Sequence, residues 1–130
     1  VRESIEQLRQ GLRAPSASGG WRVDIFWCEA LGEANQRRAE VTARQLRDAD
    51  QGAFGFRVGQ VRVRAFTAAA NARPGYQVEA DEIRPEQSER TQGAALADFL
   101  RANGGPVLQE RISRTATPAY LSVFLCGSSG

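Results

Sequence analysis

The sequence contains no histidine, and this absence excludes several familiar kinds of catalytic site. Without histidine, no Ser-His-Asp or Cys-His nucleophilic arrangement can form, and most catalytic zinc sites lose their usual ligand. Only two cysteines are present, which are too few for a cysteine-rich metal site. We therefore predict that the protein is not an enzyme, that it has no catalytic or metal-ligating residues and that it uses no cofactor.

Methionine and long apolar runs are also missing. Because methionine is absent even from position 1, we expect the chain to be a processed piece of a longer protein. The longest apolar run is four residues, far too short to cross a bilayer. Any membrane attachment would therefore need an anchor outside this chain. No signal peptide is visible.

Lysine is absent as well, so all 17 basic residues are arginine; against 15 acidic residues they give a net charge of +2. Two interpretations are open: selection for planar donors that bind phosphate or carboxylate in a bidentate manner, or a GC-rich coding sequence that supplies arginine in place of lysine. The arginines are spread along the chain among the acids, which favours the second. A charge of +2 is too small to indicate nucleic-acid binding, and we predict no nucleic-acid partner.

A length of 130 residues is enough for one domain with a single core. Near the N-terminus, Ile5, Leu8 and Leu12 follow a helical spacing, and a stretch rich in proline, serine and glycine comes next. This helix either packs loosely on the domain or ends a stalk that leads from an upstream anchor. The predicted parts are an N-terminal helix and linker over 1–20, one α+β domain over 21–126 and a tail over 127–130.

Two segments near opposite ends of the domain are alike: 23–28 and 121–126 are both β-branched and aromatic, and each ends on a cysteine. Both faces of 21–29 are largely apolar, which is typical of an interior strand. Further strands are predicted over 60–67, 76–83, 107–114 and 119–126, and helices over 35–48 and 85–102. This order predicts a ferredoxin-like βαββαβ sandwich with an extra C-terminal strand and two helices on one face of a mixed sheet.

Charge matching predicts a hairpin between 60–67 and 76–83. In that pairing Arg62 and Arg64 lie opposite Glu79 and Asp81, and each cross-strand ion pair contributes up to about 1 kcal/mol.

The last strand is predicted to lie beside the first. The segment 119–126 is much more apolar than 107–114, and polar strands belong at sheet edges. We therefore expect 119–126 to run parallel to 21–29, with 107–114 outside it as a hairpin partner. This places Cys28 and Cys126 at the same end of neighbouring strands. The residues leave two outcomes open, a disulfide between them or two buried free thiols.

The face opposite the helices is predicted to carry aromatic and charged side chains. An exposed sheet with several aromatic rings can bind sugars or bases by stacking. The predicted ligand-binding residues of this open face are Phe26, Arg62, Arg64, Phe66, Gln77 and Phe124.

Two half-repeats along the chain resemble the pattern of SPOR domains, the peptidoglycan-binding modules of bacterial envelope proteins. One is Trp21-Arg22-Val23-Asp24-Ile25-Phe26, which precedes the alanine-rich segment 34–48, and the other is Gly75-Tyr76-Gln77-Val78-Glu79-Ala80, which precedes 89–100. The similarity covers residues 21–112. It implies an extracytoplasmic domain, periplasmic or membrane-anchored, whose sheet face contacts denuded glycan strands.

We accordingly predict a non-catalytic envelope domain that binds peptidoglycan glycan or an envelope protein through its open face. One alternative is a structural or assembly domain, an oligomer in which residues 1–14 or a second copy cover that face. An RNA-binding module is a weaker alternative, because Glu79 and Asp81 stand where such modules carry aromatic and basic residues. An enzyme with paired carboxylates is also weaker, because no motif selects a pair among Asp24, Glu29, Glu79 and Glu82.

Overall fold

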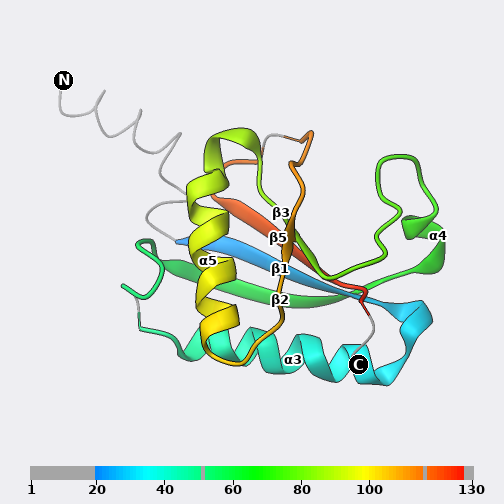
Figure 1. Cartoon of the computed structure of the whole chain (residues 1–130), viewed down its shortest axis with the longest axis horizontal. Helices are drawn as coiled ribbons and strands as arrows, with labels where there is room; N and C mark the ends of the chain where they lie inside the picture. The colour runs from blue at the N-terminus through cyan, green and yellow to red at the C-terminus, as the bar shows by residue number, and fades with distance from the viewer. Residues whose placement is uncertain (1–19, 51, 116, 128–130) are drawn as a thin grey trace, which may run out of the picture.

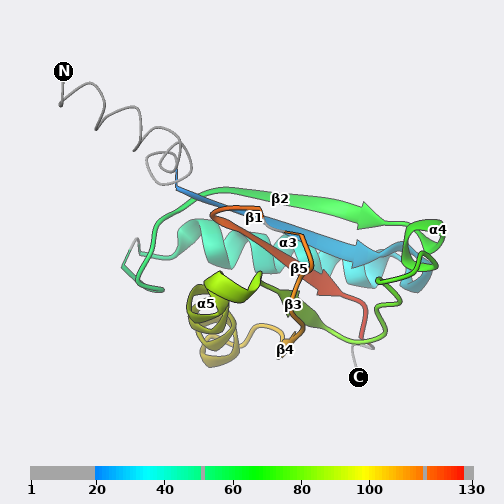
Figure 2. The ribbon, with the colours of Figure 1, turned by 90° about the horizontal axis from the view of Figure 1, so that it is seen from above.

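Five strands form one mixed sheet in the computed structural model, which describes residues 20–50, 52–115 and 117–127 (Figure 1). The predicted N-terminal helix and the C-terminal tail lie almost wholly outside these residues. The strands lie in the order β2-β1-β5-β3-β4, which Figure 2 shows from above. Their bounds are Trp21–Cys28 (β1), Val58–Phe66 (β2), Glu82–Arg84 (β3), Gln109–Glu110 (β4) and Tyr120–Leu125 (β5).

Two long helices cover one face of this sheet: α3 (Glu33–Asp48) and α5 (Arg90–Ala102). A short helix, α4 (Ala68–Asn71), follows β2, and single 3-10 turns, η1 (Glu29–Leu31) and η2 (Gln87–Glu89), precede the long helices. Both long helices pack into the same core, because their apolar positions recur at helical spacing. The fully buried members of that core are Val23, Ile25, Ala39, Ala43, Leu96, Leu100, Leu121, Val123 and Leu125.

The central pair of strands is the predicted one. β1 and β5 run parallel in continuous register, from Arg22 opposite Tyr120 to Trp27 opposite Leu125. Every residue of β5 after Tyr120 is buried, which agrees with the rule that strands apolar on both faces occupy the interior of a sheet. The prediction from apolar content is therefore confirmed.

The predicted hairpin between 60–67 and 76–83 is wrong. β2 pairs parallel with β1 at the sheet edge, and residues 76–81 form an irregular connection rather than a strand. Arg62 and Arg64 lie beside Asp24 of β1 instead of Glu79 and Asp81. The physical reason is burial: Asp24 is only 2% exposed and needs charged partners, whereas Glu79 is exposed to water.

The segment 107–114 is also placed differently from the prediction. Only Gln109–Glu110 forms a strand, and this strand pairs parallel with β3 rather than as a hairpin with 119–126. β3 lies between them and pairs antiparallel with β5. Ile83 of β3 is buried, while both residues of β4 are exposed, so the polar strand still takes the edge. The ferredoxin-like arrangement depended on the missing hairpin, and this strand order does not provide it.

The connection from β2 to β3 folds back over the open face. It contains α4, which lies at the C-terminal end of β2 (Figure 1). Val78 from this connection joins a second, smaller cluster of buried residues that also contains Cys28, Phe66, Phe124 and Cys126. The open face is therefore covered at one end by the chain's own backbone.

Candidate ligand-binding groove

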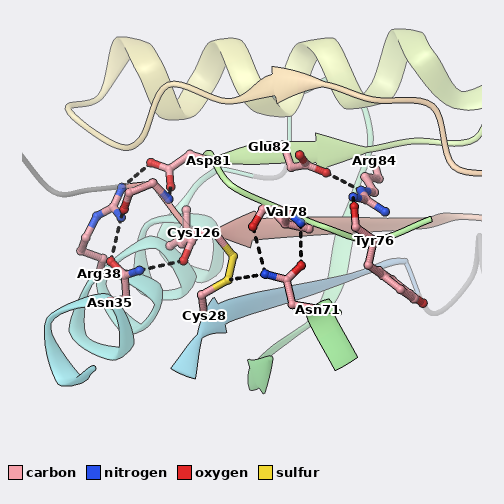
Figure 3. The surroundings of a disulfide bond; sticks show 12 residues. Cys28, Asn35, Arg38, Asn71, Tyr76, Val78, Asp81, Glu82, Arg84 and Cys126 are labelled. Atoms are coloured by element: carbon pink, nitrogen blue, oxygen red, sulfur yellow. Dashed lines mark hydrogen bonds and ion pairs between the residues drawn. A yellow bond between two sulfur atoms is a disulfide. The ribbon is translucent and has the colours of Figure 1, made fainter. Parts of the chain in front are cut away.

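Cys28 and Cys126 form a disulfide, with their Cα atoms 5.0 Å apart (Figure 3). Cys28 ends β1 and Cys126 directly follows β5, so the parallel pairing brings the two thiols to the same end of the sheet. Both side chains are buried. Of the two outcomes that the sequence leaves open, the structure has the disulfide and not two free thiols.

Asn71 holds the β2–β3 connection over this disulfide. Its side-chain Nδ2 donates a 3.0 Å hydrogen bond to the carbonyl oxygen of Val78, and the Val78 backbone N–H donates to Asn71 Oδ1 over 2.6 Å. Figure 3 shows the amide of Asn71 lying between Cys28 and Val78. The side-chain amide of Asn71 thus satisfies both backbone groups of Val78, as a neighbouring strand would. These bonds hold the connection over one end of the open face.

A second set of polar contacts fixes the end of β5 beside the disulfide. Asn35 Nδ2 of α3 donates a 3.0 Å hydrogen bond to the carbonyl oxygen of Leu125, and Asp81 Oδ1 accepts one of 2.8 Å from the backbone N–H of Gly127. Arg38 pairs with Asp81, as Figure 3 shows. Asp81 therefore ties α3 and the end of β5 to the start of β3, and it has no role on the open face.

The three phenylalanines of the open face pack on one another. Phe26 stacks on Phe124 at a ring distance of 4.9 Å, and Phe66 contacts both rings edge-on at 5.8 and 5.1 Å. Phe66 and Phe124 are only 6% and 3% exposed, and Phe26 is half-buried. The three rings therefore do not form a fully exposed platform, and only Phe26 among them is partly open to solvent. The β2–β3 connection covers them from one side, and Arg84 lies 5.0 Å above the Phe124 ring.

Asp24 is the first of two buried carboxylates on this face. Arg62 donates two hydrogen bonds to it, of 2.8 and 2.9 Å, and the hydroxyl of Tyr120 donates a third of 2.7 Å. Burial alone would raise the pKa of Asp24. The hydrogen bonds from Arg62 and Tyr120, together with the charges of Arg62 and Arg64, outweigh burial and lower this pKa below its ordinary value. Burial, and then the bond to Asp24, raises the pKa of Tyr120.

Glu82 of β3 is the second buried carboxylate. It pairs with Arg84, and it accepts a 3.2 Å hydrogen bond from Arg111 Nη1. Arg84 also donates to the carbonyl oxygens of Gly75 and Tyr76 over 3.0 and 3.2 Å. Glu82 and Arg84 therefore hold the β2–β3 connection against β3 and shape the wall beside Tyr76, which Figure 3 shows next to Arg84.

Between these elements the open face is hollowed into a groove of about 640 Å³. Strands β1, β5 and β3 form its floor, and residues 74–76, 111–115 and 117 contribute its walls. Its aromatic members are Phe26, Phe66, Tyr76, Tyr120 and Phe124, and its charged members are Arg84, Glu86, Arg111 and Arg114. Tyr76 is 38% exposed and Ile112 is 40% exposed, so both walls present apolar surface to solvent.

The structure brings together only part of the predicted site. Phe26, Phe66 and Phe124 line the groove, whereas Arg62 and Arg64 lie outside it on the edge strand. Gln77 is exposed in the β2–β3 connection, with a left-handed φ of 54°, and it is not part of the sheet.

Sequence reasoning missed the two tyrosines and three arginines of the groove lining. Tyr120 could have been found, because it shares the alternation of Ser122 and Phe124 along the last strand. The others are wall residues in or beside irregular segments, where no periodicity marks a face. The missed residues are Tyr76, Arg84, Arg111, Arg114 and Tyr120.

Comparisons with protein-family models, with curated proteins and with solved structures gave no match for this chain. Within the part of the chain that the structure describes, no helix has the length and apolar character needed to cross a membrane. In the same residues, no three cysteine or acidic side chains are grouped closely enough to hold a metal ion.

Proposed function

We propose that this chain is a non-catalytic, extracytoplasmic domain whose groove binds a peptidoglycan glycan strand. The observation that supports this most directly is the groove itself, about 640 Å³ in volume, with the rings of Tyr76, Tyr120 and Phe26 along it. The apolar faces of sugar rings stack on aromatic side chains, and sugar hydroxyls bind polar groups at the edges of such sites. Ser113, Thr115 and Thr117 on the wall offer those polar groups.

The disulfide supports the extracytoplasmic part of the proposal. Disulfides persist in oxidising compartments and are rare where glutathione and thioredoxin keep thiols reduced. Cys28 and Cys126 are bonded across 98 residues of sequence and are buried in the open-face cluster. The SPOR-like half-repeats point to the same compartment and ligand, and we retain that relationship as part of the proposal.

The charge arrangement favours binding over catalysis. A general acid near neutral pH needs a raised pKa, but the pKa of Asp24 is lowered by its partners. Glu82 is likewise held by two arginines. Both carboxylates act as structural partners that orient arginines around the groove.

Retention of the purified domain on isolated peptidoglycan tests the proposal. The wild type should sediment with the insoluble material. Tyr76→Ala and Ile112→Asp, which change the two walls, should remain in the supernatant, whereas Val41→Ala, at a 53% exposed position on α3, should behave as the wild type. Thermal unfolding of each variant separates lost binding from lost folding. A wild-type domain that is not retained would overturn the proposal.

A structural or assembly role is the second candidate, and one observation favours it. Phe66 and Phe124 are already buried within the chain, so part of the face serves packing rather than ligand binding. In this alternative a second copy or an envelope protein would cover the exposed Tyr76 and Ile112. Light scattering over a range of protein concentrations tests whether a second copy covers them. A dimer that is broken by Ile112→Asp would support the assembly role.

A further inference from the structure

Positive charge is concentrated on the open face. The outward residues of the sheet and the groove lining together carry six arginines, namely Arg22, Arg62, Arg64, Arg84, Arg111 and Arg114. The same surface carries three carboxylates, namely Asp24, Glu82 and Glu86. Elsewhere in the described residues there are eight arginines and ten acidic residues. Within the described part of the chain, the excess of positive charge therefore comes from this one surface.

Most of these arginines are already engaged with carboxylates. Arg62 and Arg64 lie beside Asp24, and Arg84 and Arg111 bind Glu82. Their donors are directed into the floor and the β2–β3 connection, where they hold the groove in shape. They supply the positive field of the face, but they have few donors left for a ligand.

Arg114 differs from these four. It lies in the groove wall, is exposed, and makes no hydrogen bond or ion pair with any described residue. Arg22 of β1 lies over the Tyr120 ring at 5.4 Å and has no carboxylate partner among the described residues. Arg114 and Arg22 are therefore the two arginines of this face without a carboxylate partner in the described part of the chain.

We propose that the groove binds its glycan through a carboxylate carried on the sugar itself, which is received by Arg114. This inference rests on the proposed function and names the substituent that the site selects. A guanidinium without a protein partner at the wall of an aromatic groove favours a carboxylate that it can bind with two parallel hydrogen bonds, while the sugar ring packs against the aromatic side chains of the groove. A neutral glycan would leave Arg114 without a partner.

The number of free arginines favours a glycan over a nucleic acid. Binding along a phosphate backbone needs several cations, each of which neutralises one phosphate. This face offers two arginines without a carboxylate partner among the described residues, Arg114 and Arg22. Two such arginines are too few for a ligand with a charge on every residue, whereas they suit a glycan that carries isolated carboxylates.

Calorimetric titration of the folded domain with three glycans of equal length tests the inference. The first is a peptide-free glycan strand with free lactyl carboxylates, the second is the same strand with those carboxylates amidated, and the third is a neutral chitooligosaccharide. The wild type should bind the first about tenfold or more tightly than the other two, because a hydrogen-bonded ion pair is lost. A peptide-bearing strand with amidated lactyl groups distinguishes the sugar carboxylate from carboxylates of the stem peptide.

Two arginine variants complete the experiment. Arg114→Gln should lose about tenfold for the free-acid strand and should bind the amidated strand as the wild type does. Arg44→Gln is the matched control, because Arg44 is also exposed but lies on α3, away from the groove. Equal binding of all three glycans, with no effect of Arg114→Gln, overturns this inference and leaves the proposed function standing. No binding of any glycan overturns the proposed function, and tighter binding of a single-stranded RNA overturns both.

Discussion

The two faces of this sheet are held together in different ways. On the helix-covered face, neighbouring side chains of β1 and β5 such as Val23, Ile25, Leu121 and Val123 are fully buried and wholly apolar. On the open face, the same strands present Asp24, Phe26, Ser122 and Phe124, and a disulfide closes one end. Apolar burial is non-directional and scales with area. Ion pairs and hydrogen bonds depend instead on specific partners and on pH.

This difference explains why the groove lies on the open face and not on the face that the helices cover. A face that is stabilised by helices has no surface left for a ligand, whereas a face stabilised by a few specific partners can leave a hollow between them. Asp24 and Glu82 each hold arginines on opposite sides of the Phe26–Phe124 stack, and the groove opens over that stack.

Truncating one residue on each face of β5 tests the contrast most directly. Leu121→Ala should lower the free energy of unfolding by about 2–5 kcal/mol, because it removes fully buried apolar volume and leaves a cavity. Ser122→Ala, on the adjacent residue that faces the groove, should change it by less than about 0.5 kcal/mol. Urea unfolding measures both. Similar losses at the two positions would show that the faces are held in the same way.

Removing the disulfide, which closes one end of the open face, should cause the second largest loss of stability. The double variant Cys28→Ala/Cys126→Ala should be less stable by about 2–4 kcal/mol, because the unfolded chain regains the freedom that the crosslink removes. Unfolding of the wild type with and without a reducing agent provides an independent measurement. The two experiments should agree in direction, and an unchanged midpoint under reduction would contradict the role given to the crosslink.

Asp24→Asn should cost about 1.5–3 kcal/mol at neutral pH, because hydrogen bonds to a charged group are stronger than those to an amide. The pKa of Asp24 in the folded state lies below the unfolded value of 3.8, so its stabilisation is complete above that value. It is lost as the pH falls through the folded-state pKa. Unfolding measured from pH 7 to pH 2 should therefore show the wild type and the variant converging at acid pH. Parallel curves would mean that the pKa of Asp24 is the same in the folded and unfolded states, so that its partners do not stabilise the charged form.

How much of this could be predicted from the sequence depends on which face is considered. The parallel pairing of 23–28 with 121–126 followed from apolar content, because burial places the most apolar strands inside the sheet whatever their partners are. The pairing put the two cysteines at the same end, but it left open whether they are bonded. The hairpin failed because charge matching does not identify a partner: Arg62 could pair with Glu79 or with Asp24, and only burial of Asp24 decides. The floor of the groove was predicted in part through Phe26 and Phe124, but its walls were not, since Arg111, Arg114 and Tyr76 lie in segments without periodicity.

The smallest expected effect concerns Glu89, at the boundary between the two faces. Its carboxylate accepts a 2.7 Å hydrogen bond from the backbone N–H of Ala119, just before β5, where Ala119 has a left-handed φ of 51°. Burial raises the pKa of Glu89 above its ordinary value of 4.5, and this outweighs the hydrogen bond from Ala119. The folded state therefore holds the proton more tightly than the unfolded state does, and Glu89 contributes less to stability as the pH rises through the folded-state pKa.

Glu89→Gln retains an acceptor for the Ala119 N–H and removes the charge. The variant should match the wild type near pH 4 and should become more stable than it by less than about 1 kcal/mol at pH 7, because the partly exposed site screens the penalty. Urea unfolding at the two pH values measures the difference. A variant that is less stable at pH 7 would show that the ionised carboxylate anchors the start of β5. In that case both ends of β5, like the open face along it, would be held by specific charged partners.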